Sequence, residues 1–150
     1  MAVIITDYKD INQTMRGIRT QVVDSLEWVE NNLPKFKDPE EAFKTLKNLV
    51  TYKNDPAGIE LLQSAGTLFD QNYWGIPGAG DCDCFTILVL AVGVVNGWNN
   101  QSIFLVGRSK LAPVHIYSSV KFQNNTYIMD LTNAYINIER EYKFRQELKV

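Results

Sequence analysis

The fold is organised around the stretch Gly78-Ala79-Gly80-Asp81-Cys82-Asp83-Cys84-Phe85 and the apolar run that follows it to Val95. The glycines make a turn, and Asp81 can accept a hydrogen bond from a backbone N–H inside a new helix as its N-cap. Cys82 then lies in the first turn, where open N–H groups and the helix dipole favour an anion. Such a position lowers the pKa of a thiol from its ordinary value of about 8.5. The stretch therefore predicts a helix over 82–95 with a nucleophile at its start.

The composition is that of an ordinary globular protein with one domain, residues 1–150. Hydrophobic residues make up 45% and charged residues 21% of the chain, and the net charge of −2 offers no basic surface for a nucleic acid. The apolar run after Cys84 has a core of about a dozen residues, short of the ~18 that span a bilayer, so no membrane partner is expected. The two cysteines are separated by one residue and make a poor disulfide staple, which favours reduced thiols and a cytoplasmic setting.

Hydrophobic periodicity divides the chain into helices followed by strands. Apolar residues recur at spacings of three and four in the first half, and the period changes to two after Asn96-Gly97. The expected elements are helices over 11–33, 39–50, 55–69 and 82–95, a loop over 71–80, strands over 103–106, 113–122 and 126–131 with a hairpin turn at Asn124-Asn125, and an edge strand within 142–150. This order predicts an α+β fold in which helices are segregated from an antiparallel sheet.

Three residues supply the types that thiol catalysis needs. His115 is the sole histidine and lies on the predicted 113–122 strand, on the face without aliphatic residues. Asp130 lies at the end of the next apolar strand. A histidine can accept the proton of the Cys82 thiol, a carboxylate can orient the imidazole ring, and the thiolate can attack a carbonyl.

The predicted hairpin does not by itself bring the histidine and the carboxylate together. With a tight turn at Asn124-Asn125, Asp130 lies opposite Ser119, and His115 is roughly 13 Å further along the strand. We therefore expect a bulge or a sharp twist near the hairpin. Without one, the ring would be oriented by another group: Asn133, Asn137 or solvent.

The same residues carry a family resemblance. Gly80-Asp81-Cys82-Asp83, Val114-His115-Ile116-Tyr117 and Met129-Asp130-Leu131-Thr132, in this order, resemble the transglutaminase-like superfamily of papain-like thiol enzymes. The resemblance covers about residues 75–135, after a helical lead-in over 1–72 and before a C-terminal strand or tail over 136–150. It implies a transglutaminase-like or papain-like core with Cys82 as nucleophile, His115 as base and Asp130 as orienting acid.

The resemblance also implies a reaction. It is acyl transfer on a peptide or amide substrate without a cofactor, either to water, as in a protease or amidase, or to an amine, as in crosslinking. The alternative is a non-catalytic module of the same fold that serves as a binding or structural component of a larger assembly, because a fold does not fix a function.

Cys84 departs from the family pattern, because many members have a second acidic residue at this position. Two positions along a helix differ by about 200°, so Cys82 and Cys84 face opposite ways. Cys82 is closer to the open N–H groups and is the expected nucleophile, whereas Cys84 is expected to be a small buried residue. The same divergence argues against a zinc site built from both cysteines with His115 and Asp130, and against a redox disulfide.

An oxyanion hole needs donors that point at the developing charge. The backbone N–H of Cys82 is one natural donor. The predicted 71–80 loop offers three candidates for a second donor or for the wall of a substrate groove: Gln71, Asn72 and Trp74.

Overall fold

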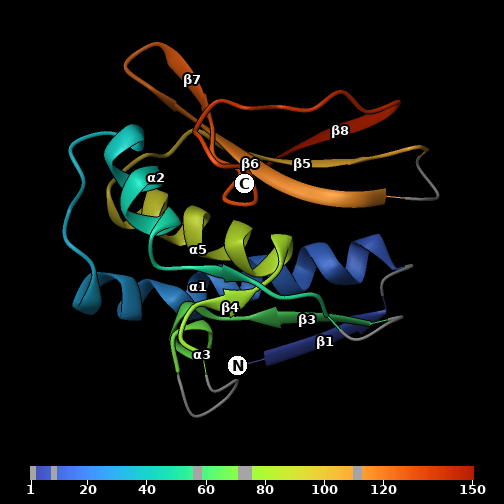
Figure 1. Ribbon diagram of the computed structural model, residues 1–150, viewed down its shortest axis with the longest axis horizontal. Helices are drawn as coiled ribbons and strands as arrows, with labels where there is room; N and C mark the ends of the chain where they lie inside the picture. Colours follow the sequence, from blue (N-terminus) through green and yellow to red (C-terminus); the bar gives the residue numbers. More distant parts are fainter. Residues whose placement is uncertain (1–2, 8–9, 56–58, 71–75, 110–112) are drawn as a thin grey trace.

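The computed structural model of the chain describes residues 3–7, 10–55, 59–70, 76–109 and 113–150 (Figure 1). Its helices are α1 (Ile11–Asn32), α2 (Pro39–Lys47), α3 (Ala65–Leu68) and α5 (Cys82–Val95). Its strands are β1 (Val3–Asp7), β2 (Thr51–Tyr52), β3 (Ile59–Gln63), β4 (Ala79–Gly80), β5 (Gln101–Gly107), β6 (Pro113–Phe122), β7 (Asn125–Ile128) and β8 (Phe144–Lys149). The α+β fold class is confirmed.

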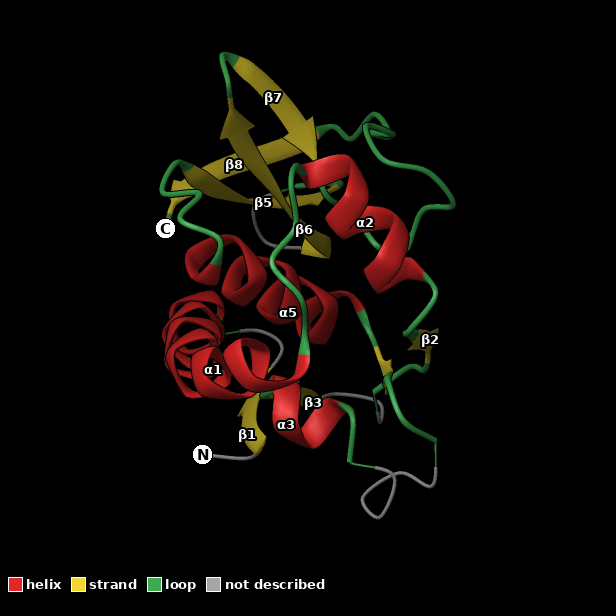
Figure 2. Cartoon of the chain, turned by 90° about the vertical axis from the view of Figure 1, so that its left-hand side faces the viewer, coloured by secondary structure: helices red, strands yellow, loops and turns green. Residues whose placement is uncertain are grey.

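Helix α5 lies at the centre of the molecule, between a sheet and α1 (Figures 1 and 2). The sheet has the order β7-β6-β5-β8, and every neighbouring pair is antiparallel. β1 and β3 form a separate antiparallel pair, and β2 and β4 a short parallel one. The residues of α5 from Asp83 to Gly93 are buried, as expected for a helix that is apolar nearly all round. The predicted edge strand at the C-terminus is β8.

Aspartate side chains cap the starts of α1 and α2. Asp10 accepts a hydrogen bond from the Gln13 N–H at 2.9 Å, and Asp38 accepts one from the Glu41 N–H at 2.8 Å. α1 ends at Asn32, just before Pro34, because a proline disfavours helical backbone in the residue before it. Within the described residues, no helix is both long and apolar enough to cross a membrane.

The predicted helix over 55–69 is wrong. Ile59–Gln63 forms β3, which pairs with β1, and only Ala65–Leu68 is helical. Part of the predicted start of this helix, residues 56–58, lies outside the described residues. Local periodicity misses the strand because its partner is the N-terminal segment, far away in the sequence, and because Leu61 and Leu62 on its opposite faces are both buried.

The hairpin between β6 and β7 turns one residue earlier than predicted. Gln123 and Asn124 form the turn with φ values of 49° and 67°, and Phe122 pairs with Asn125. Positive φ at both central residues is typical of the type I′ hairpin turn, whose backbone twist matches that of the two strands it joins. The expected bulge near the hairpin is not present, because the β6–β7 pairs run in regular register.

This register changes the neighbours of Asp130. The Met129 N–H donates to the Ser118 carbonyl at 2.9 Å. Asp130 therefore lies opposite Tyr117, rather than opposite Ser119 as the predicted register had it. Tyr117 is only two residues from His115 on the same face of β6, within reach of a diagonal side-chain contact.

Candidate functional site

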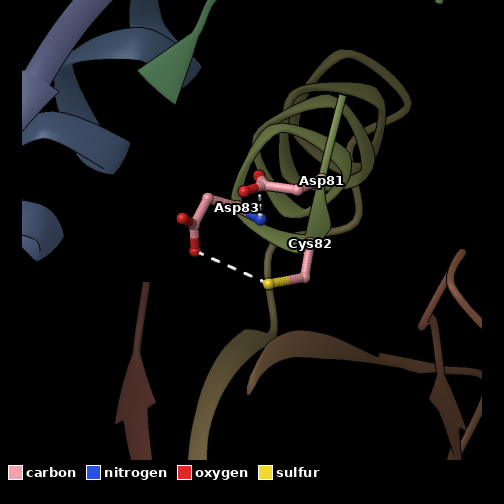
Figure 3. Close-up of side chains that lie close together, drawn as sticks. All are labelled: Asp81, Cys82 and Asp83. Atoms are coloured by element: carbon pink, nitrogen blue, oxygen red, sulfur yellow. Dashed lines mark hydrogen bonds between the residues drawn. The ribbon is translucent and has the colours of Figure 1, made fainter. Parts of the chain in front are cut away.

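Helix α5 carries Cys82 at its first position, as the capping pattern predicts. The Asp81 side chain accepts a hydrogen bond from the Asp83 N–H at 3.2 Å, and the Thr86 hydroxyl donates to the Cys82 carbonyl at 2.8 Å. These bonds fix the first turn of the helix. Figure 3 shows the thiol of Cys82 at this end of α5, with the Asp83 carboxylate beside it.

Cys84 faces away from Cys82, as expected. Its thiol is fully buried and donates to the Leu61 carbonyl at 3.1 Å, while the Gln63 amide donates to its sulfur at 3.5 Å. Cys82, in contrast, is half-buried. Of the two cysteines, Cys82 is therefore the more exposed residue.

His115 and Asp130 are in direct contact. Nε2 of His115 lies 2.6 Å from Oδ2 of Asp130, and the two side chains are 15% and 8% exposed. Oδ1 of Asp130 accepts bonds from the Thr132 N–H at 3.0 Å and the Thr132 hydroxyl at 2.6 Å. Burial raises the pKa of Asp130, but the hydrogen bonds from His115 and Thr132 outweigh burial and bring the pKa below its usual value.

The contact also fixes the protonation of the ring. An ionised carboxylate can only accept hydrogen bonds, so the proton lies on Nε2 of His115, and Nδ1 is the nitrogen that can accept one. The two asparagines considered as orienting groups act elsewhere. Asn133 donates to Asp130 Oδ2 at 3.3 Å and supports the carboxylate, while Asn137 accepts from the Ile128 N–H at 2.8 Å.

Two tyrosines that the sequence reasoning did not assign to the site stack on His115. The ring centroids of Tyr117 and Tyr142 lie 5.7 Å and 6.4 Å from that of the imidazole, each at an interplanar angle of 28°. Strand alternation places Tyr117 on the same face as His115, so this contact had a signal in the sequence. Tyr142 precedes β8 and reaches the ring only through the tertiary fold.

Cys82 and His115 line one cavity of about 80 Å³, together with Glu60 and Asp83. A second pocket, of about 320 Å³, also contains His115 and is lined by polar and aromatic side chains: Tyr52, Asp130, Thr132, Asn133, Arg140 and Tyr142. The imidazole therefore lines both a small, mostly apolar cavity and a larger polar pocket.

The Cys82 thiol is hydrogen-bonded to a carboxylate rather than to the imidazole. Its sulfur donates to Asp83 Oδ1 at 3.9 Å, and no hydrogen bond joins it to His115 within the described residues. Burial raises the pKa of the Cys82 thiol, Asp83 and Asp81 raise it further, and the backbone N–H of Ile116 partly offsets them. The expectation that the helix start lowers this pKa is wrong, because burial first and the adjacent carboxylates second disfavour the thiolate.

The carboxylates beside the thiol are themselves perturbed. Burial, followed by the nearby Asp55, raises the pKa of Asp81 to about 9. Burial, followed by Glu60, raises the pKa of Asp83 well above its usual value. Carboxyl groups this close together favour a shared proton or a neutralising partner.

Gln71, Asn72 and Trp74, the candidates for an oxyanion hole or a groove wall, lie outside the described residues. In the part of the chain that the structure describes, the clusters able to hold a metal ion do not combine Cys82, Cys84, His115 and Asp130.

Comparisons with known proteins give little beyond the geometry. No protein-family model matches the chain, and no curated protein matches it. A solved structure described as "a putative cysteine protease from Cytophaga hutchinsonii" is similar at a TM-score of 0.47 and 14% sequence identity. The alignment covers 87% of this chain but only 40% of that one.

Proposed function

We propose that the protein is a cysteine-dependent enzyme that transfers an acyl group from a peptide or amide substrate, with Cys82 as nucleophile, His115 as base and Asp130 as the acid that orients the ring. The observation that carries the proposal is the 2.6 Å contact of Asp130 with Nε2 of His115. It leaves Nδ1 as the proton acceptor on a ring that lines the same cavity as Cys82.

The reaction follows from these roles. The thiol proton passes to Nδ1 of His115, and the Cys82 sulfur attacks the carbonyl carbon of the amide. The amine then leaves with the proton from His115, and a thioester remains on Cys82. Attack by water gives hydrolysis and regenerates the thiol, whereas attack by an amine gives a new amide. The Cys82 N–H at the start of α5 is the donor within the described residues that is best suited to the oxyanion.

Formation of the thiolate is the demanding step, because carboxylates surround the sulfur. An isolated thiolate at Cys82 is disfavoured by burial and by Asp83. An ion pair with a protonated His115, which Asp130 stabilises, offsets that cost. The proposal therefore requires that His115 controls the reactivity of Cys82.

Alkylation with iodoacetamide near pH 7 tests this requirement. Mass spectrometry of the full chain should find Cys82 modified much faster than Cys84, and His115→Ala should slow the modification of Cys82. Cys84→Ala is the matched control and should leave the rate at Cys82 unchanged. Faster modification of Cys84, or a His115→Ala rate equal to that of the wild type, would refute the proposal.

A library of acyl-amide probes then tests the chemistry. The wild type should give a thioester adduct on Cys82 that is lost in Cys82→Ala. Adding an excess of a primary amine separates the two outcomes, because crosslinking gives an amide of that amine and hydrolysis gives the free acid. The absence of any adduct under all conditions would count against catalysis.

One observation favours a second candidate, a non-catalytic binding module. The Cys82 thiol donates to Asp83 and its pKa is raised, which keeps it protonated and unreactive. On this reading both cysteines react slowly with iodoacetamide, and His115→Ala has no effect on the rate. The alkylation experiment therefore decides between the two candidates.

A further inference from the structure

Four carboxylates gather beside the start of α5. Asp55 follows β2, Glu60 lies in β3, and Asp81 and Asp83 flank Cys82. One oxygen from each of the four lies within 4.8 Å of the others. Within the described residues, no lysine or arginine forms an ion pair with any of them. Carboxyl groups held this close together need shared protons or a bound cation to offset their repulsion.

Asp83 supplies a second, independent observation. Its side chain is only 5% exposed, and its Oδ2 is buried without a hydrogen-bond partner. The other oxygen accepts the long bond from the Cys82 thiol (Figure 3), and Glu60 lies within hydrogen-bond reach of the same carboxyl group. Buried polar atoms in proteins almost always have a partner, and a carboxylate oxygen without one is costly. Because two carboxyl groups can bond each other only through a shared proton, the buried Oδ2 of Asp83 requires either a proton or a cation in the cluster.

The cluster is also held in place by the backbone. Asp55 Oδ2 accepts from the Leu61 N–H at 2.9 Å, and Asp81 Oδ1 accepts from the Asp83 N–H at 3.2 Å. Each of these carboxylates therefore has one oxygen fixed by the chain, and the two carboxyl groups also lie within hydrogen-bond reach of each other. Bonds of this kind orient the ligands of metal sites.

We propose that Asp55, Glu60, Asp81 and Asp83 form a binding site for a divalent cation of the calcium type. Oxygen-only donors select hard cations, and Ca²⁺ takes its ligands at about 2.3–2.6 Å. Ca²⁺ takes about six to eight oxygen ligands, so four carboxylates can share one ion, whereas Mg²⁺ is usually held by about one or two carboxylates. Mg²⁺ requires a tighter octahedron, with ligands at about 2.0–2.1 Å. The site does not depend on Cys82 being catalytic.

Calorimetric titration of the chelator-treated full chain with CaCl₂ tests the site. One Ca²⁺ should bind per chain, and MgCl₂ should bind more weakly. Asp83→Asn and Glu60→Gln should each weaken Ca²⁺ binding at least tenfold. Glu40→Gln, an exposed acid in the first turn of α2, is the matched control and should bind as the wild type does. Cys82→Ala should also bind Ca²⁺ normally, which separates this test from that of the enzyme.

Thermal unfolding gives a second measurement that does not depend on heats of binding. Ca²⁺ should raise the unfolding temperature of the wild type and of Glu40→Gln. Asp83→Asn should unfold at a higher temperature than the wild type without metal, because one repulsive charge is removed, and should gain little from Ca²⁺. Glu60→Gln, a half-buried position, serves if Asp83→Asn does not fold. The proposal is overturned if millimolar Ca²⁺ gives no heat of binding and does not raise the unfolding temperature. It is also overturned if Mg²⁺ binds more tightly than Ca²⁺, or if Zn²⁺ does so in a manner that requires Cys82.

Discussion

Replacing Asp130 with asparagine tests whether this residue sets the protonation of His115. Asp130 Oδ1 accepts two hydrogen bonds from Thr132, one of them from a backbone N–H that can only donate. The asparagine oxygen must therefore stay on the Thr132 side, which turns its NH₂ group toward Nε2 of His115. Nε2 then has to accept, so the ring proton moves to Nδ1, the atom that must receive the thiol proton.

The size of the effect follows from the bond that is lost. A hydrogen bond to a charged group contributes about 1.5–3 kcal/mol, and Asp130 makes such a bond to the imidazolium that pairs with the thiolate. Rotating the asparagine to rescue this bond leaves the half-buried Thr132 N–H without its acceptor, at a cost of up to about 1–3 kcal/mol. At 1.36 kcal/mol per factor of ten, alkylation of Cys82 near neutral pH should slow about tenfold to a hundredfold.

The assay is the rate of iodoacetamide modification of Cys82 between pH 6 and 11, followed by mass spectrometry. The difference between Asp130→Asn and the wild type should shrink at the alkaline end, where the thiol ionises without His115. Asp24→Asn, the same chemical change on the exposed face of α1, should react like the wild type. If Asp130→Asn is alkylated at the wild-type rate near pH 7 while its urea unfolding is unchanged, the reasoning on the tautomer is wrong.

Two further predictions concern stability. The pKa of Asp130 is lower in the folded protein than the value of about 3.9 in an unfolded chain, so its stabilising contribution is complete above that value and is lost as the pH falls through the folded-state pKa. The urea midpoint of the wild type should therefore fall more steeply below pH 4 than that of Asp130→Asn, and parallel curves would contradict this. Gly78 and Gly97 have φ values of 80° and 79°, but a Cβ on Gly78 would lie 2.1 Å from the Leu49 carbonyl oxygen, whereas one on Gly97 meets nothing within 4 Å. Urea denaturation should give a cost of about 1–2 kcal/mol for Gly97→Ala and about 2–5 kcal/mol for Gly78→Ala, and equal costs would show that the backbone relaxes freely at Gly78.

The sequence by itself determined the parts of this protein whose causes are local. Asp38 and Asp81 mark helix starts because the cap and the N–H that it accepts are two or three residues apart. The opposite directions of Cys82 and Cys84 follow from the pitch of one helix. The position of His115 on the face of β6 without aliphatic residues follows from the alternation of side chains along a strand, which is also a local property of the chain.

Tertiary structure decided everything that depends on segments far apart in the sequence. β3 is a strand because the N-terminal segment pairs with it, and nothing in residues 55–69 records that partner. The position of one turn residue, Gln123, sets the register that brings Asp130 to His115. The thiol pKa rises instead of falling because folding buries Cys82, and burial adds to the effect of Asp83 and Asp81, its neighbours along the chain. Burial and charge at a site are sums over neighbours in space, and the one-dimensional pattern contains only neighbours along the chain.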